Sequence, residues 1–226
     1  MDIGVHIAVS GAIANERILE QVTHNLANAP TPGFKRSVMH LEAVPFSLPR
    51  NDWAGSDSLA FVQARPPVIT QDQGVVEETG RPLDLAIEGI GRFQVSTPQG
   101  VQSVRKGDFL LNPDGTIVTR EGHPVLGDQG KSLQVDRRER TEVSEDGEIR
   151  AGERKIGRLM VVDEDGRQVP QEQYRVAQGH LERSNVNSLE EMVTMMEQLR
   201  NHGSYMKLIR DFDELEGKTI QELGRV

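Results

Sequence analysis

The chain has 226 residues, of which 36% are hydrophobic and only 4% aromatic, and its formal net charge is −9. An acidic chain repels phosphate groups, so the composition argues against nucleic-acid binding as the main role. The chain contains no Cys, which excludes disulfide scaffolds, thiolate zinc sites and Cys nucleophiles. No apolar run approaches the ~20 residues that a membrane-spanning helix requires.

Residues 3–28 are predicted to form one long helix. Seven side chains recur there at alternating steps of three and four, which is the narrow seam of a helix that packs lengthwise on another helix. The seam consists of Val5, Ala8, Ala12, Asn15, Leu19, Val22 and Leu26. Two prolines and a glycine within residues 29–33 end the helix.

A second long helix is predicted from Ser188 to about Leu215. Ser188 and Glu191 have the spacing of a capping box at its start. A second seam follows, with Met192, Met195, Leu199, His202, Met206 and Ile209. Two interpretations of this Met-rich stripe stay open. It is either a core stripe, or a surface that packs against several non-identical neighbours, because Met side chains adapt to different partners.

Between the helices the pattern changes to strands and turns. Alternation in residues 83–87 and 93–95, and the turn signal Asn112–Gly115 between two apolar runs, predict an antiparallel β-domain. The fold class is therefore α+β: the two terminal helices pack as a coiled-coil-like pair, and a mostly antiparallel all-β domain is inserted between them. The predicted domains are a discontinuous helical domain at 1–36 and 180–226, an extended connector with short strands at 37–80, and a β-rich domain at 81–179.

The sequence contains few residue patterns typical of a catalytic or ligand-binding site. The six His residues show no metal-ligand spacing. Gly89-Ile90-Gly91 lacks the third glycine and the following helix of a dinucleotide loop, and Asp163-x-Asp165-Gly166 lacks the later ligands of a calcium loop. We therefore expect no catalytic residues, no metal, no cofactor and no small-molecule substrate, and we predict that the chain is not an enzyme.

Two terminal motifs and several central ones carry a family resemblance. Residues 25–36 read NLANAPTPGFKR, and residues 184–187, just before the second helix, read SNVN. Both resemble the signatures of the flagellar rod and hook protein family. Residues 81–89, 105–109 and 122–127 resemble the central β-domain of that family. The resemblance covers nearly the whole chain in the family's order.

The resemblance implies a structural subunit of the bacterial flagellar basal-body rod. Residues 157–162, 205–209 and 213–217 resemble the proximal rod member, whose subunits polymerise into a helical drive shaft that transmits torque from motor to hook. The implied partners are the chain itself, other rod proteins and the flagellar type III export apparatus. The implied location is the rod in the periplasmic space. Because Asp2 stands where a basic region should be and the first cation is Arg17, we expect export without a cleaved signal.

Alternatives stay open at this point. The chain could be a distal rod protein or another axial subunit, or a cell-wall-directed enzyme for which no catalytic constellation exists, or, more weakly, a peptide-binding module.

The resemblance also implies an interface. Gly33 is expected in a conformation barred to other residues, and Phe34 as an anchor. The expected assembly residues are Leu19, Val22, Asn25, Leu26, Asn28, Gly33, Phe34, Asn185, Val186, Asn187, Met192, Met195, Leu199, Met206 and Ile209.

Overall fold

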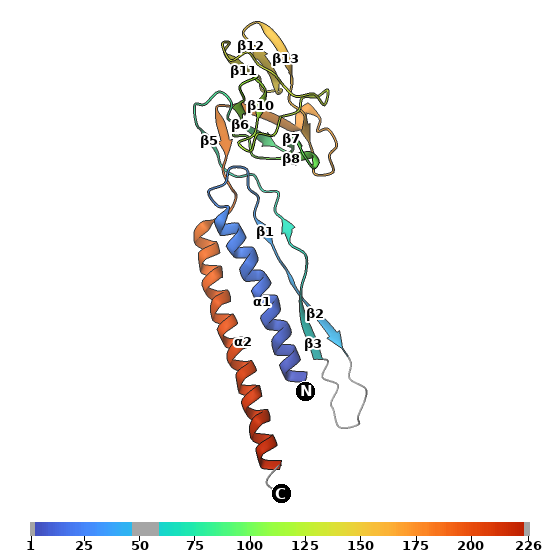
Figure 1. Cartoon of the computed structure of the whole chain (residues 1–226), viewed down its shortest axis with the longest axis vertical. Helices are drawn as coiled ribbons and strands as arrows, with labels where there is room; N and C mark the ends of the chain where they lie inside the picture. Colours follow the sequence, from blue (N-terminus) through green and yellow to red (C-terminus); the bar gives the residue numbers. More distant parts are fainter. Residues whose placement is uncertain (1–2, 47–58, 224–226) are drawn as a thin grey trace. The chain divides into compact units, whose positions relative to one another are not determined.

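A computed structural model describes residues 3–46 and 59–223 (Figure 1). The predicted domains at 1–36, 37–80 and 180–226 include residues 1–2, 47–58 and 224–226, which lie outside the described residues. The described chain divides into two compact units. We call residues 3–27, 36–46, 59–70 and 186–223 the helical unit, and residues 28–35 and 71–185 the β unit.

The helical unit is built on two antiparallel helices, α1 (Ile3–Ala27) and α2 (Ser188–Leu223). Their direction follows from which residues meet. Gly4 near the start of α1 lies against Phe212 far along α2, and Gly11 lies against Tyr205. α1 ends one residue before the predicted Asn28. α2 starts where predicted but continues past Leu215, because Gly217 does not interrupt it.

Four strands complete the helical unit. In residues 36–70, β1 (Ser37–Val38) pairs with β4 (Val68–Ile69), and β2 (Leu41–Phe46) pairs with β3 (Leu59–Ala64), both antiparallel. β3 packs on α1, and the Val62 N–H donates to Ser10 Oγ at 3.3 Å. α1 is therefore the middle layer, with α2 on one side and the strands on the other (Figure 1). The sequence predicted short strands here, but not a hairpin that runs along α1.

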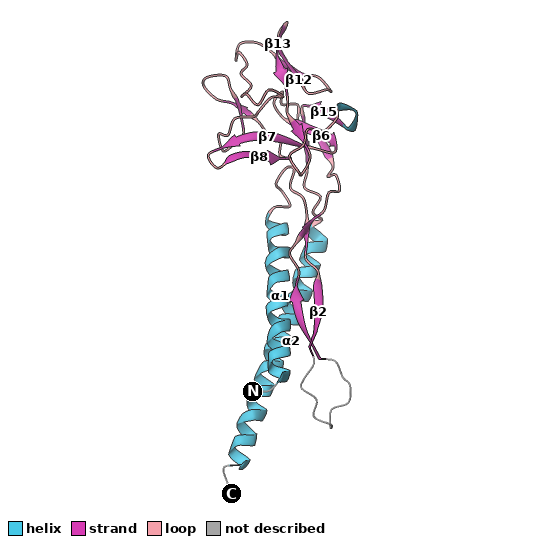
Figure 2. Ribbon diagram, turned by 90° about the vertical axis from the view of Figure 1, so that its right-hand side faces the viewer, coloured by secondary structure: helices cyan, strands magenta, loops and turns pink. Residues whose placement is uncertain are grey.

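The β unit holds many short antiparallel pairs, drawn as magenta strands in Figure 2. β6 pairs with β15, β7 pairs with β8 and β14, and β12 pairs with β11 and β13. The elements are β5 (Val76–Glu78), β6 (Leu85–Gly89), β7 (Arg92–Thr97), β8 (Gly100–Val104), β9 (Leu110–Leu111), β10 (Ile117–Val118), β11 (Thr141–Val143), β12 (Glu148–Ala151), β13 (Arg154–Arg158), β14 (Val161–Val162), a 3-10 turn (Gln171–Gln173), β15 (Tyr174–Gln178) and β16 (His180–Glu182).

The core of the β unit is aliphatic around one aromatic pair. The Phe93 and Phe109 rings meet edge to face, with centroids 5.2 Å apart. Buried Val, Leu and Ile side chains from most of the strands surround them, as the low aromatic content requires. Such a core stabilises the unit through apolar area removed from water.

The sequence patterns predicted several turns of the β unit correctly. β9 and β10 pair across Asn112–Gly115, with Leu111 opposite Ile117, so this hairpin is confirmed. Residues 145–147 turn between β11 and β12, and residues 163–166 form the other predicted turn. The fold is α+β with antiparallel sheets, as predicted.

The bounds of the two units differ from the predicted domain bounds. Residues 28–35 and 180–185 belong to the β unit by contact, and residues 36–70 belong to the helical unit.

In the part of the chain that the structure describes, no helix is both long enough and apolar enough to span a membrane.

These contacts predict which fragment of the β-rich part is stable. Residues 81–179 alone lack β5, β16 and Glu182, and so leave the buried Arg105 without its carboxylate. Losing one partner of a buried ion pair costs roughly 3–5 kcal/mol. We therefore expect the fragment 71–185 to melt cooperatively at a clearly higher temperature than the fragment 81–179, as measured by circular dichroism. Equal melting temperatures would contradict this account.

Candidate assembly interface

Most of the buried side chains of α1 are small. Ala8, Ala12 and Val22 are buried there, as is Asn15, whose side-chain amide donates to the Gln198 carbonyl of α2 at 2.9 Å. Leu19 and Leu26 are partly buried. Of the predicted seam residues, Asn15 is thus placed directly against α2. This polar residue is satisfied by a backbone carbonyl in the first third of α2, which fixes the register of the pair.

Glycines let α2 aromatics approach α1 closely. A Cβ on Gly11 would lie 2.6 Å from Tyr205 Cε1, and one on Gly4 would lie 3.0 Å from Phe212 Cζ. Gly costs a helix about 1 kcal/mol relative to Ala. The aromatic contacts offset this cost, because each ring buries a large apolar surface. Tyr205 was not among the predicted seam residues.

The predicted α2 seam is only half correct. Met195, His202 and Ile209 are partly buried on the side of α2 that faces α1, in line with Tyr205 and Phe212. In contrast, Met192, Leu199 and Met206 are exposed. The face of α2 that packs on α1 includes Glu191 and Gln198. Because both side chains are polar, the spacing of apolar residues did not indicate this face. α2 consequently has two apolar faces rather than one.

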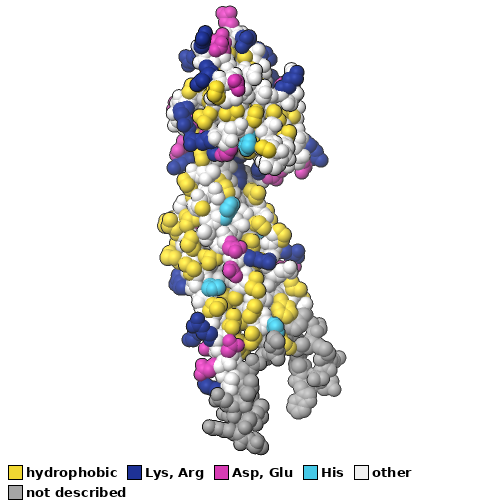
Figure 3. All heavy atoms as spheres, viewed as in Figure 1, with side chains coloured by type: hydrophobic (Ala, Val, Ile, Leu, Met, Phe, Trp, Pro, Cys, Tyr) yellow, Lys and Arg dark blue, Asp and Glu magenta, His cyan; other side chains and the backbone are white. Residues whose placement is uncertain are grey.

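The second apolar face of α2 we call the outer stripe. It is exposed in the subunit, with Met196 at 53% and Leu199 at 51% of full exposure. Figure 3 shows hydrophobic side chains gathered on this side of α2 near its start. The outer stripe consists of Leu189, Met192, Val193, Met196, Leu199 and Met206. A contiguous apolar strip on a soluble protein marks an interaction surface.

A buried carboxylate joins the first signature to α2 within the helical unit. Glu191 is 1% exposed, and its Oε1 lies 2.6 Å from Arg36 Nε. The Asn25 side-chain amide donates to Glu191 Oε2 at 3.4 Å and to the Ser37 carbonyl at 2.8 Å. The Ser37 N–H returns a hydrogen bond to Asn25 Oδ1 at 3.1 Å. Asn25 thus holds the start of β1 against α1 and α2 together.

The start of α2 is capped differently from the prediction. The Leu189 N–H donates to Asn187 Oδ1 at 3.1 Å, so Asn187 is the N-cap, an arrangement that satisfies an orphan helix donor. Ser188 is therefore the first helical residue. The Glu191 carboxylate turns to Arg36 instead of back to the cap. The predicted Ser188–Glu191 capping box is wrong, because Asn187 caps the helix and the Glu191 carboxylate pairs with Arg36.

A second buried carboxylate organises the β unit. Glu182 is 2% exposed and lies 2.6 Å from both Lys35 Nζ and Arg105 Nε. The Gly74 N–H also donates to Glu182 Oε1, at 3.0 Å. Arg105 further donates to the Gly89 carbonyl at 2.8 Å, and so fixes the turn between β6 and β7. Lys35 and Arg36, adjacent in the first signature, thus each neutralise a buried glutamate within their own unit.

These contacts set the ionisation of Glu182. Burial opposes the charged form, but the hydrogen bonds from Lys35, Arg105 and the Gly74 N–H outweigh it, so the pKa of Glu182 is lowered from its ordinary value of 4.5. The carboxylate is therefore charged in the folded protein at neutral pH.

Gly33 sits where no other residue fits. Its φ is +68°, and a Cβ would lie 2.6 Å from the Lys106 backbone nitrogen. Its N–H donates to the Glu182 carbonyl at 2.7 Å. The expectation that Gly33 adopts a conformation barred to other residues is confirmed.

The remaining predicted residues lie near these networks. The Asn185 N–H donates to the Phe34 carbonyl at 3.4 Å, and the Asn185 side chain donates to the Asp72 carbonyl at 2.9 Å. Asn28 accepts from the Thr31 N–H at 3.0 Å. Val186 is partly buried just before the cap. Assembly roles for these residues remain predictions.

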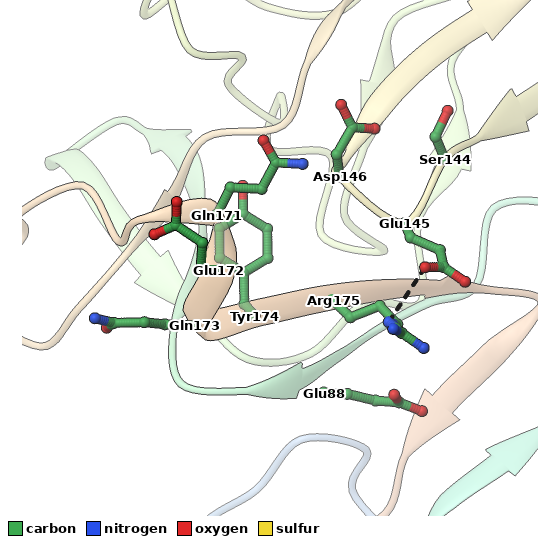
Figure 4. Close-up of a pocket in the computed structure, with 9 residues that line it drawn as sticks. All are labelled: Glu88, Ser144, Glu145, Asp146, Gln171, Glu172, Gln173, Tyr174 and Arg175. Atoms are coloured by element: carbon green, nitrogen blue, oxygen red, sulfur yellow. Dashed lines mark ion pairs between the residues drawn. The ribbon is translucent and has the colours of Figure 1, made fainter.

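The β unit also has an open acidic hollow (Figure 4). It is lined by Glu88, Ser144, Glu145, Asp146, Gln171, Glu172, Gln173, Tyr174 and Arg175. Arg175 pairs with Glu145 at 3.2 Å, and burial raises the pKa of Tyr174. Among the described residues, no group of three or more acidic or His side chains has the arrangement of a metal site.

Comparison with known proteins identifies the family. Residues 86–151 match the family model "Flagellar hook protein FlgE/F/G D1 domain", and residues 177–222 match "Flagellar basal body rod FlgEFG protein C-terminal". The chain is 30% identical to the flagellar basal-body rod protein FlgF of Caulobacter vibrioides, over 100% of both chains. It belongs to the flagellar basal-body rod protein family.

Other members of the rod family match over nearly their full length. FlgF of Escherichia coli is 30% identical over 99% of both chains. The flagellar basal-body rod protein FlgG of Buchnera aphidicola is 27% identical over 95% of this chain and 97% of its own. The order and extent of the matches agree with the resemblance seen in the two signatures.

Glu182 gives the rod-family subunit a defined acid sensitivity. Because its pKa is lower when folded, its contribution is fully present above about pH 4.5 and is lost as the pH falls through the folded pKa. Glu182→Gln should lower the unfolding free energy at pH 7 by roughly 3–5 kcal/mol. The difference from the unchanged chain should shrink below pH 4.5.

Denaturant unfolding of the full chain across this pH range measures the effect. Glu145→Gln is the matched control, because it removes an exposed ion pair with Arg175 that is worth at most about 1 kcal/mol. A deficit for Glu182→Gln that did not change with pH would show that shape, not charge, matters at this position.

Gly33→Ala should destabilise the β unit beyond the cost of its backbone angle. Gly80 is the matched position, since its φ is +70° but nothing lies within 4 Å of its Cβ position. Gly80→Ala therefore reports the strain of positive φ alone, about 1 kcal/mol. Gly33→Ala adds a clash with backbone atoms, so its melting temperature should fall clearly further. Equal losses in the two variants would argue against the close approach at Gly33.

Proposed function

We propose that the chain is a structural, non-catalytic subunit of the proximal part of the flagellar basal-body rod. In this role it polymerises into the helical drive shaft that transmits torque from motor to hook. Full-length identity to FlgF rod proteins supports this function. The single structural observation that carries it is the outer stripe, an apolar surface on α2 that the subunit itself leaves uncovered.

The outer stripe implies an assembly contact for the following reason. A helix of a soluble monomer normally has one apolar face and one polar face. α2 satisfies its first apolar face by packing on α1, and Met196 and Leu199 remain exposed on the second. Covering that face requires a neighbouring molecule. Met side chains in the stripe suit neighbours that differ in sequence, as other rod proteins would.

Lengthwise helix packing also suits the transmission of torque. Gly4 and Gly11, seven residues apart, receive Phe212 and Tyr205, also seven residues apart. This heptad spacing supports a coiled-coil-like pairing of α1 and α2 in the assembled rod. Contacts that join unlike surfaces of successive subunits do not close, and so they build a helical tube.

The remaining expectations belong to the same proposal. The partners are the chain itself, other rod proteins and the flagellar type III export apparatus, and the location is the rod within the periplasmic space. The β unit serves as an independently folding domain, and the helical unit as the axial core. Leu19, Val22 and Leu26 stabilise the helix pair within a subunit, whereas Met192, Leu199 and Met206 contact neighbours.

Leu199→Asp tests this function. Placing a charge on the outer stripe should prevent the chain from entering the rod, because an unpaired buried charge costs several kcal/mol. The melting temperature of the free chain should not change, since Leu199 is exposed in the subunit. Immunodetection in isolated basal bodies, together with swimming assays, measures the outcome.

Asn201→Asp is the matched control, because it introduces the same group at an exposed position off the stripe on the same helix. It should leave the cells motile. Wild-type amounts of Leu199→Asp in purified rods would contradict the proposal.

A further inference from the structure

The outer stripe has a glycine in its course. Gly203 lies between Leu199 and Met206, and it is helical and exposed. No described atom lies within 4 Å of the position that a Cβ on Gly203 would occupy. Because glycine weakens a helix interior relative to alanine, the fold of the single subunit gains nothing from this residue. Gly203 therefore forms a notch in an apolar face, and the described residues leave the notch open.

The helical unit itself shows what fills such a notch. Gly4 and Gly11 of α1 leave room for Phe212 and Tyr205 of α2, which runs antiparallel to α1. A small residue on one helix and a large one on the other let the two axes approach closely. By the same packing, Gly203 can receive a large apolar side chain from an antiparallel helix of a neighbouring molecule.

α1 has an exposed face of its own, which we call the outer row. It consists of His6, Val9, Ile13, Glu16, Arg17 and Glu20, all exposed. Ile13 is its largest apolar side chain and is 49% exposed. At about 100° per residue, Ile13 is rotated by about 200° from Gly11 and from Asn15, which both contact α2. The outer row therefore points away from the α2 of its own subunit.

Ile13 and Gly203 lie at the same height of the helix pair. Gly11 lies against Tyr205, and the two helices are antiparallel. Two residues forward along α1 and two residues back along α2 lead to Ile13 and Gly203. A second copy in the same orientation, displaced sideways without sliding, therefore presents its Ile13 at the notch.

The charges beside the notch agree with this register. Glu16 follows Ile13 by three residues, and Arg200 precedes Gly203 by three, so the two charges meet when antiparallel helices place Ile13 over Gly203. The exposed basic residues that flank the outer stripe are Arg200, Lys207 and Arg210. The outer row is acidic toward its C-terminal end, where two glutamates outweigh one arginine.

We infer that Gly203 on the outer stripe of one subunit receives Ile13 from the outer row of a second copy of this chain, with Glu16 of that copy against Arg200. The inference rests on the proposed function, and it names the partner of the outer stripe. Each copy carries one face of each kind, so the contact joins unlike surfaces and leaves a free face at each end to repeat it. Stable pair interfaces bury about 800 Å² per partner, so two free copies joined by a strip one helix wide should associate weakly.

Gly203→Ala tests the notch, because folding and assembly should respond in opposite directions. Alanine favours the helix, so the melting temperature of the free chain should rise by about 2–4 °C. The same methyl group fills the notch, so the amount of the chain in purified rods should fall several-fold in cells that make only this variant. Unchanged amounts in the rods would overturn the proposal.

Gly217→Ala is the matched control. Gly217 is also a helical glycine with open space at its Cβ position, but it lies beyond the end of the outer stripe. Its replacement should raise the melting temperature without changing the amount of the chain in the rods. An equal loss from the rods in both variants would overturn the proposal, because it would show that helix stiffness, not the notch, matters.

Cysteine cross-linking identifies the partner, because the chain has no Cys of its own. Since Ile13 faces away from α2, a disulfide between positions 13 and 203 must join two copies. In rods oxidised in place, the full chain carrying Ile13→Cys and Gly203→Cys should give a ladder at multiples of 25.1 kDa. The control pairs Ile13→Cys with Asn201→Cys, which is exposed but about 200° round the helix from Gly203, and it should give no ladder.

Other cross-links would name a different partner. Dimers from Gly203→Cys alone would overturn the proposal in favour of two outer stripes that pair with each other. A cross-link from Gly203→Cys to a protein of another mass would overturn it in favour of a different rod protein.

The proposed function can fail separately from this inference. A double-cysteine variant that is present in purified rods but gives no ladder would overturn the inference alone. Rods that form normally and never contain the unchanged chain would overturn the proposed function as well.

Discussion

The rest of the helical unit depends on the lengthwise contact between α1 and α2, the two ends of the chain. This contact is made by unequal partners. α1 contributes a seam of Gly, Ala and Asn, and α2 contributes Tyr205 and Phe212, which lie over the glycines. Small residues on one helix let the axes approach, and large residues on the other fill the space. Because Asn15 bonds a carbonyl of α2, sliding one helix along the other would leave a buried amide unsatisfied.

Two buried glutamates explain the charged end of the first signature. Lys35 binds Glu182 in the β unit, and the next residue, Arg36, binds Glu191 in the helical unit. Each carboxylate is almost fully buried, and each has further hydrogen bonds, from Arg105 and Gly74 to Glu182 and from Asn25 to Glu191. Removing one partner of such a pair is far more costly than the net gain from forming it. The signature is thus a fold determinant in both units.

The outer stripe shows how a stable subunit can remain ready to assemble. The subunit buries what it needs for its own fold and leaves a narrow apolar strip on α2 uncovered. A strip one helix wide is smaller than the roughly 800 Å² per partner that stable pair interfaces bury. Assembly then requires several neighbours at once, which is what a helical tube supplies.

The sequence by itself determined the α+β class, both helices and several turns. Helix periodicity, proline and glycine positions and the Asn-Pro-Asp-Gly turn act through local sterics, which need no knowledge of distant contacts. The family resemblance indicated that Gly33 adopts a conformation barred to other residues, and its φ is positive. The two signatures also located residues that turned out to organise buried networks, among them Asn25 and Asn187.

Only the tertiary structure decided which face of α2 meets α1. Apolar spacing placed Met192, Leu199 and Met206 in the seam, but the face that is buried carries Glu191, Gln198 and Tyr205. A glutamate enters a seam only when a distant cation neutralises it, and Arg36 is 155 residues away in the sequence. The β2–β3 hairpin was missed for a similar reason, since its place depends on packing against α1. Pairings between distant residues leave no local periodicity, so a buried charge and its partner become visible only once the chain is folded.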